Sequence, residues 1–129
     1  MIVGIGTDVC SVVRVAGVLE RHGERFVERI LTPEERGRYA RTRDKAGHLA
    51  KRFAAKEAFS KAIGTGIHAP FKWHCIAVGR DPRGKPLIVP SEEMARHLAS
   101  LGVVRSHVSL TDDHDVAVAF VVLEGRERP

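Results

Sequence analysis

Residues 52–66 read Arg-Phe-Ala-Ala-Lys-Glu-Ala-Phe-Ser-Lys-Ala-Ile-Gly-Thr-Gly, a stretch that predicts a helix ending in a glycine loop. Its alanines and phenylalanines recur at helical spacing and indicate a stripe that faces the core. Glu57 and Lys61 lie one turn apart on the other side, which places their Cβ atoms about 6 Å apart. A carboxylate can hold a divalent cation and an ammonium can hold a phosphate, so the pair is a candidate site for a metal–phosphate substrate. The alternative is an ordinary surface ion pair, because such pairs are common and individually weak.

The composition of the chain indicates a single folded domain over residues 1–129, since hydrophobic residues make up 43% of it. The formal net charge of +5 favours an acidic partner, which could be nucleic acid, a phosphorylated cofactor or an acidic protein. Cys10 and Cys75 are too few for a disulfide framework and predict reduced thiols in a cytoplasmic protein. The sequence shows neither a signal peptide nor an apolar run of the roughly 20 residues that span a bilayer.

Hydrophobic periodicity and capping residues predict a small α+β domain with an antiparallel sheet and one long central helix. Thr32 and Glu35 have the spacing of a capping box, which marks a helix start. The predicted helices cover residues 12–22, 24–31, 46–63 and 92–101, with another beginning at 33, and the predicted strands cover 2–7, 74–79, 86–89, 107–111 and 116–123. The last strand is apolar at successive positions, so we expect helices or another subunit to cover both of its faces.

Two more carboxylates follow predicted strands. Asp8 comes after the first strand, whose Gly4 and Gly6 would let a ligand or another backbone approach closely, and Asp112 follows the strand over 107–111. The alternatives are that Asp8 caps the next helix and that Asp112 shapes a turn. Carboxylates from separate elements, together with a lysine, fit oxygen-ligated Mg²⁺ better than zinc.

Four blocks of sequence resemble a known family in their identity and order: Gly4-Ile-Gly-Thr-Asp8, the stretch 52–66, Gly84-Lys-Pro86 and Val108-Ser-Leu-Thr-Asp112. The family is holo-[acyl-carrier-protein] synthase, the small bacterial type of 4′-phosphopantetheinyl transferase. The resemblance covers essentially the whole chain, and its central block is highly specific. It implies the α+β fold of that family and assembly as a homotrimer with active sites between neighbouring subunits.

The resemblance also implies a reaction. The enzyme would move the 4′-phosphopantetheine arm of coenzyme A to a serine of apo-acyl carrier protein, release adenosine 3′,5′-bisphosphate, and serve fatty-acid biosynthesis. By the family pattern Asp8 and Glu57 hold Mg²⁺, and Lys61 contacts the phosphates. Many family members have His where this chain has Asp112 and others have Asp, and this departure puts a histidine base in doubt here. We therefore expect Asp112 to be an accessory catalytic residue.

The remaining site residues are implied by the same resemblance. The expected coenzyme A contacts are Arg52, Lys61, Gly64, Gly66, Lys85, Pro86 and Ser109. Arg14 matches a family position that contacts the acidic carrier protein, and Arg21 and Arg25 are its plausible neighbours. In a trimer, the segment 109–112 would face the metal site of an adjacent chain.

Two rival functions are weaker. In a nucleic-acid-binding domain the basic residues of the central helix would track phosphates, but Asp8 and Glu57 would then repel the nucleic-acid backbone. A non-catalytic coenzyme A-binding protein would not need both carboxylates. We therefore expect coenzyme A and acyl carrier protein as partners, with neither nucleic acid nor a membrane.

Overall fold

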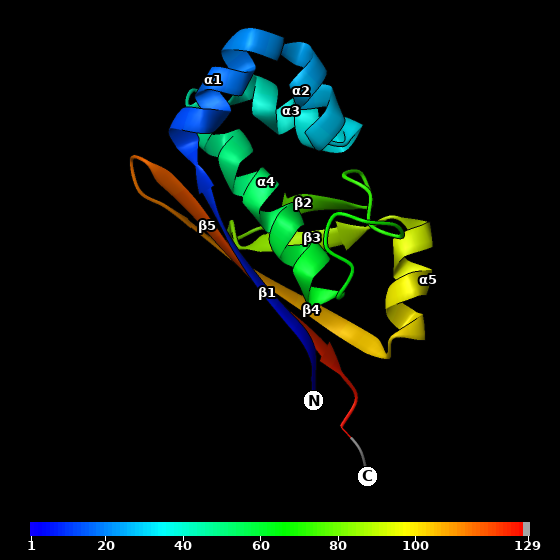
Figure 1. Ribbon diagram of the computed structural model, residues 1–129. Coiled ribbons are helices and arrows are strands. Elements are labelled where there is room, and N and C mark those ends of the chain that lie inside the picture. The colour runs from blue at the N-terminus through cyan, green and yellow to red at the C-terminus, as the bar shows by residue number, and fades with distance from the viewer. Residues whose placement is uncertain (128–129) are drawn as a thin grey trace.

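The computed structural model describes residues 1–127 and forms an α+β unit of five strands and five helices within that range (Figure 1). The strands are β1 (Ile2–Ser11), β2 (Ile76–Arg80), β3 (Pro86–Pro90), β4 (Val103–Asp112) and β5 (Val116–Gly125). The helices are α1 (Val12–His22), α2 (Glu24–Ile30), α3 (Pro33–Arg41), α4 (Lys45–Ala62) and α5 (Glu92–Ser100). The predicted fold class is confirmed, although the strands form two antiparallel sheets rather than one.

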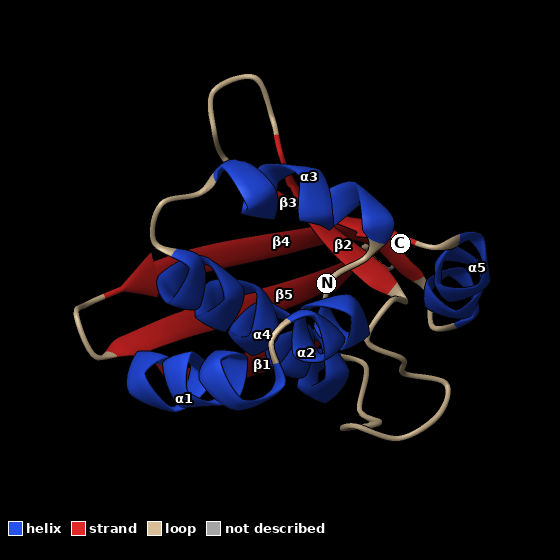
Figure 2. Ribbon diagram, turned by 90° about the horizontal axis from the view of Figure 1, so that it is seen from above, coloured by secondary structure: helices blue, strands red, loops and turns tan. Residues whose placement is uncertain are grey.

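The larger sheet has the strand order β1-β5-β4, so the apolar last strand is central, as the sequence predicts. β2 and β3 form a separate hairpin. α4 crosses one face of the larger sheet, while α1, α2 and α3 gather at one end of the molecule and α5 lies at the side (Figures 1 and 2). The main core therefore lies between α4 and this sheet.

Two glycines in β1 allow α4 to lie directly against that strand. A Cβ atom at Gly4 would lie 2.0 Å from the carbonyl oxygen of Ala62, and one at Gly6 would lie 1.9 Å from that of Ala58. Neither distance is possible for real atoms, so any larger residue would push the strand away from the helix. The backbone that these glycines admit is that of α4.

The predicted helix starts are largely confirmed. Ser11 caps α1 by accepting a hydrogen bond from the Arg14 backbone N–H, and Thr32 and Glu35 form the capping box of α3. The predicted strand ends are less accurate, because β1 continues to Ser11 and β4 begins at Val103. Asp8 consequently lies within a strand and does not cap the next helix.

The second face of the larger sheet is open in the described part of the chain. Side chains alternate along β5, so that Val121 is fully buried under α4 whereas its neighbour Phe120 is 44% exposed. Beside Phe120 lie apolar residues of the same face, which we call the open face: Ile5, Val9, Val118 and Val122. The chain's own helices thus cover only one face of β5, and a second cover stays a prediction. Within residues 1–127, no helix is long and apolar enough to cross a membrane.

Candidate active site

Asp8 and Glu57 meet where β1 lies against α4. Asp8 has the same strand parity as the two glycines and faces the helix, so its side chain is only 12% exposed. Lys61 lies one turn after Glu57, and its Nζ donates to the Asp8 carboxylate at 3.2 Å and to the Thr7 carbonyl oxygen at 2.9 Å. Among the described residues, Lys61 forms its ion pair with Asp8 and none with Glu57. The simple surface pair within one helix is therefore wrong.

The negative charges of the Asp8 and Glu57 carboxylates repel each other. Burial raises the pKa of Glu57, and the nearby Asp8 carboxylate raises it further, while Lys61 acts in the opposite direction. Such a pair favours a cation. The described residues 1–127 contain no group of three or more His, Cys, Asp or Glu side chains arranged to hold a metal ion. A cation bound between Asp8 and Glu57 would therefore have these two carboxylates as its protein donor set. This set fits Mg²⁺, which keeps several waters and commonly binds one or two carboxylates plus substrate phosphate.

A cavity of about 360 Å³ adjoins the carboxylate pair. Arg14 lies on one side, and the aromatic rings of Phe26 and Phe53 form part of an apolar wall. Cys10 also lines it, but burial and the charge of Asp8 raise the pKa of its thiol to about 11. The thiol is therefore protonated at neutral pH and is not a nucleophile.

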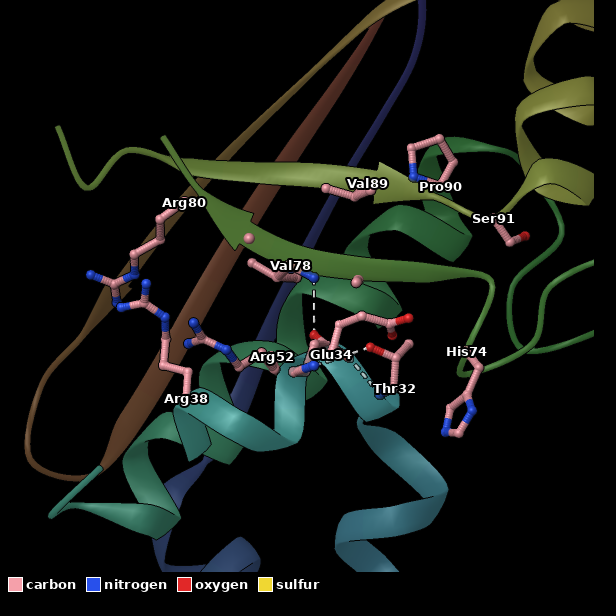
Figure 3. Close-up of a pocket in the computed structure, with 13 residues that line it drawn as sticks. Thr32, Glu34, Arg38, Arg52, His74, Val78, Arg80, Val89, Pro90 and Ser91 are labelled. Atoms are coloured by element: carbon pink, nitrogen blue, oxygen red, sulfur yellow. Dashed lines mark hydrogen bonds between the residues drawn. The ribbon is translucent and has the colours of Figure 1, made fainter. Parts of the chain in front are cut away.

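A second cavity of about 360 Å³ lies between α3, α4 and β2, and we call it the arginine pocket. Arg38, Arg52 and Arg80 come from these three elements, and their side chains converge on its edge (Figure 3). Arg52 is 1% exposed and its Nη1 atom has no hydrogen-bond partner. Burial and the charge of Arg80 lower the pKa of Arg52 to about 10. Like charges and an unpaired buried donor together suit an incoming anion.

The positive charges of the arginine pocket also act on His48, which lies one turn before Arg52 on α4. Burial and the charge of Arg52 lower the pKa of His48 to about 3, so its imidazole is neutral at physiological pH. Neighbouring basic groups on α3, α4 and β2 contribute to the shift. The pocket thus carries uncompensated positive charge, which a bound phosphate would neutralise.

Lys85 and Pro86 lie at the tip of the β2–β3 hairpin, near the arginine pocket. Asp81 accepts hydrogen bonds from the backbone N–H groups of Arg83 and Lys85, and Pro86 pairs with Arg80 in the sheet register. The hairpin thereby places Lys85 at the same end of β2 as the arginine side chains. Lys85 is thus a fourth basic side chain near this pocket.

Gly64 and Gly66 follow the last turn of α4 with φ angles of 84° and 60°. A Cβ atom would meet nothing within 4 Å at either position, so their backbone conformation, and not crowding, favours glycine. Both lie just beyond Lys61.

Asp112 and Ser109 are not brought to the carboxylate pair within one chain. They lie on β4, and β5 separates that strand from β1, since Asp112 pairs with Ala117, which in turn pairs with Cys10. Asp112 lies 3.6 Å from the Lys51 ammonium, and Ser109 is exposed on the sheet. If these residues act at the same site as Asp8, another subunit has to supply them.

The three arginines expected to contact a carrier protein are exposed on the first two helices. Arg14 and Arg21 lie on α1, and Arg25 lies on α2 near Phe26. Sequence reasoning missed Arg38 and Arg80. Neither arginine belongs to a motif in the sequence, and only the packing of α3 beside β2 brings the two together.

Comparisons with known proteins agree with the fold. Residues 4–121 match the family model of the 4′-phosphopantetheinyl transferase superfamily. A holo-[acyl-carrier-protein] synthase of Aromatoleum aromaticum is 52% identical over 98% of this chain and 100% of its own length.

Solved structures of such synthases superimpose closely. The crystal structure of the enzyme from Neisseria meningitidis has a TM-score of 0.92 and 42% identity, covering 96% of this chain and 99% of that one. The enzyme from Bacillus anthracis, in complex with CoA (3′,5′-ADP), has a TM-score of 0.82 and 38% identity, covering 98% and 99%. The chain therefore belongs to the 4′-phosphopantetheinyl transferase superfamily and, within it, to the holo-[acyl-carrier-protein] synthases.

Proposed function

We propose that this chain transfers the 4′-phosphopantetheine group of coenzyme A to a serine of an apo-acyl carrier protein, with Mg²⁺ as cofactor. The observation that carries the proposal is the juxtaposition of Asp8 and Glu57 with the Lys61 ammonium. A complex of CoA (3′,5′-ADP) with a relative of the same fold supports coenzyme A as co-substrate. A metal cation and a lysine ammonium both stabilise the negative charge of a pyrophosphate. This site has two carboxylates that can hold the cation, and Lys61 supplies the ammonium.

Asp8 and Glu57 would hold the metal ion. When bound, Mg²⁺ would neutralise charge on the pyrophosphate and make its phosphorus a better electrophile. Lys61, whose side chain is 53% exposed, has room to move from Asp8 to a phosphate oxygen. Gly64 and Gly66 would let the following loop pass close to the bound coenzyme.

In the transfer step the carrier serine oxygen forms a bond to the phosphorus that bears the pantetheine arm. The bond from that phosphorus to the bridging oxygen breaks, and adenosine 3′,5′-bisphosphate leaves with the bonding electrons. The serine proton passes to a carboxylate or to water, for which Asp112 of a neighbouring subunit is our accessory candidate. Lys61 would stabilise charge that develops on the phosphates.

The arginine pocket is our candidate for the nucleotide end of coenzyme A. Arg52 offers an unpaired buried donor, and Arg38 and Arg80 add charge beside it. Lys85 and Pro86 lie at the neighbouring hairpin tip. Guanidinium groups bind phosphate through paired hydrogen bonds, so a phosphorylated ribose fits this position.

The acyl carrier protein would approach the first cavity over α1 and α2. Acyl carrier proteins are acidic, and Arg14, Arg21 and Arg25 present positive charge on that side. Arg14 also lines the cavity that contains Asp8 and Glu57, so docking there would bring the serine to the metal site. The net charge of +5 supports an acidic partner of this kind.

Assembly as a homotrimer would bury the open face and complete the site. Phe120 and Val9 lie on that face and are 44% and 64% exposed in the single chain. A neighbouring subunit could then bring Ser109 and Asp112 to the carboxylate pair. The two cysteines are free and buried, which supports a location in the reducing cytoplasm, and we propose fatty-acid biosynthesis as the pathway that the enzyme serves.

Mass spectrometry of an apo-carrier incubated with the protein, coenzyme A and Mg²⁺ tests the proposal. We expect a fixed mass gain that corresponds to the phosphopantetheine arm. The gain should vanish with EDTA and return with excess Mg²⁺. A carrier that stays unmodified with wild-type protein, across several bacterial carriers, would refute the transferase assignment.

A further inference from the structure

A buried ion pair between Lys56 and Glu35 adjoins the arginine pocket, whose wall includes Glu35, and the pair has no part in the transfer chemistry. The Lys56 ammonium, 0% exposed, donates to Glu35 Oε1 at 2.6 Å, to the Ile30 carbonyl at 2.6 Å and to the Trp73 carbonyl at 2.8 Å. These three bonds use all of its hydrogens. Burial lowers the pKa of Lys56, and the charge of Glu35 opposes that shift.

Glu35 accepts two further hydrogen bonds besides the one from Lys56. Its Oε1 atom also accepts from the Thr32 backbone N–H at 2.9 Å, and Oε2 accepts from the Val78 N–H at 2.9 Å. One carboxylate therefore joins α3 to β2, and through Lys56 it joins both to α4. A buried ion pair is weak evidence for stability, because the loss of hydration offsets much of the attraction. Its effect here is to fix the relative positions of three elements.

The same three elements carry the three arginines. Arg38 lies one turn after Glu35 on α3, Arg52 lies one turn before Lys56 on α4, and Arg80 lies two residues after Val78 on β2. Residues at these spacings share a face of their helix or strand. The arginine pocket is thus built on the same three faces as the ion-pair network, and Figure 3 shows the three arginine side chains at its edge.

Three guanidinium groups on separate elements repel one another. Burial, together with the positive charges of Arg80 and Arg38, lowers the pKa of Arg52, while Glu35 acts in the opposite direction. Without an anion, repulsion would favour separation of α3, α4 and β2 at this edge. Glu35 and Lys56 oppose that separation by direct bonds across the same gap, and Glu35 also supplies a compensating negative charge.

We propose that Glu35 and Lys56 are positioning residues that hold the arginine pocket in its anion-binding geometry before the nucleotide arrives. The inference rests on the proposed role of that pocket for the phosphorylated end of coenzyme A. It assigns the pair to coenzyme affinity, whereas Asp8 and Glu57 are positioned independently by the glycine contacts between β1 and α4. Loss of the pair should therefore raise KM for coenzyme A and leave kcat nearly unchanged.

The test measures binding of adenosine 3′,5′-bisphosphate by titration calorimetry, together with KM and kcat for coenzyme A. The main variant is Glu35→Gln/Lys56→Met, which removes both charges at similar volume, a change that proteins often tolerate. Glu35→Gln alone is the second variant, because a buried lysine can lose its proton and stay neutral. Leu98→Ala, in α5 and remote from the pocket, is the control for general destabilisation.

We expect both Glu35 variants to bind the bisphosphate about tenfold more weakly, a difference of about 1.4 kcal/mol, with KM for coenzyme A rising in parallel. Leu98→Ala should lower the melting temperature and keep wild-type affinity. Wild-type affinity in either folded Glu35 variant would mean that the pair only stabilises the fold. An Arg52→Met variant separates the two proposals: if it binds the bisphosphate normally, the arginine pocket itself is misassigned.

Discussion

Replacing Gly6 with alanine should separate β1 from α4 and disable the carboxylate pair. The added Cβ atom would lie 1.9 Å from the Ala58 carbonyl oxygen and 2.9 Å from the Ala62 nitrogen. Both are backbone atoms in the last turn of α4, so no side chain can rotate out of the way. An ordinary contact begins at 3.4 Å, which requires a shift of about 1.5 Å between the strand and the helix.

The size of the effect follows from that shift. Overpacking a core typically costs about 1–3 kcal/mol, and a clash between two backbones belongs at the upper end, about 3 kcal/mol. At about 4 °C per kcal/mol for a domain of this size, the melting temperature should fall by about 12 °C. Asp8 lies two residues further along the same strand. Because a misplacement of about 1 Å can reduce a rate about 100-fold, phosphopantetheine transfer should fall at least that much while the protein is still folded.

The assay combines thermal unfolding followed by circular dichroism with the transfer reaction at a temperature well below the transition. Gly37→Ala is the matched control, because a Cβ atom at this position in α3 meets nothing within 4 Å. Alanine should stabilise that helix by about 0.5–1 kcal/mol and leave transfer unchanged. If Gly6→Ala melts and reacts like the wild type, the contact between strand and helix does not position the site.

Three other perturbations test separate parts of the proposal. Asp8→Asn and Glu57→Gln should each reduce transfer to near background without unfolding the protein, and full activity in either would refute the metal assignment. Arg14→Glu should raise KM for the carrier and not for coenzyme A, an effect that added salt partly reproduces; equal rises in both would place Arg14 in the coenzyme site. Phe120→Glu should convert a trimer into monomers in sedimentation equilibrium. A mixture of inactive Glu57→Gln and Asp112→Ala chains should regain part of the activity. Monomers with full activity would exclude active sites shared between subunits.

Local signals in the sequence were sufficient for the helix boundaries. Ser11, Thr32 and Gly23 act through their own neighbours, so capping and a φ of 52° at the glycine leave a direct trace in the sequence. The end of β1 was not predictable in this way. Residues 8–11 pair with 116–119, and that register depends on a strand more than a hundred residues away.

The candidate site likewise has one part that the sequence predicts and one that it does not. Glu57 and Lys61 share a helix, and their spacing marks them from the sequence alone. That Lys61 would instead pair with Asp8 depends on how β1 crosses α4, which only the three-dimensional arrangement determines. Arg38 and Arg80 lie 42 positions apart in the numbering and meet only because α3 packs beside β2. No local pattern distinguishes them from other surface arginines.

The bond from Lys61 to Asp8 has a consequence for the order of binding. With the ammonium at 3.2 Å from the Asp8 carboxylate, the protein already supplies an internal substitute for the metal ion. A metal ion that arrives alone must displace this substitute without offering it another partner. A metal ion that arrives with a pyrophosphate gives the displaced ammonium a new anion. Metal and coenzyme should therefore bind cooperatively, each raising the affinity for the other by the same factor, because one side chain exchanges partners between them.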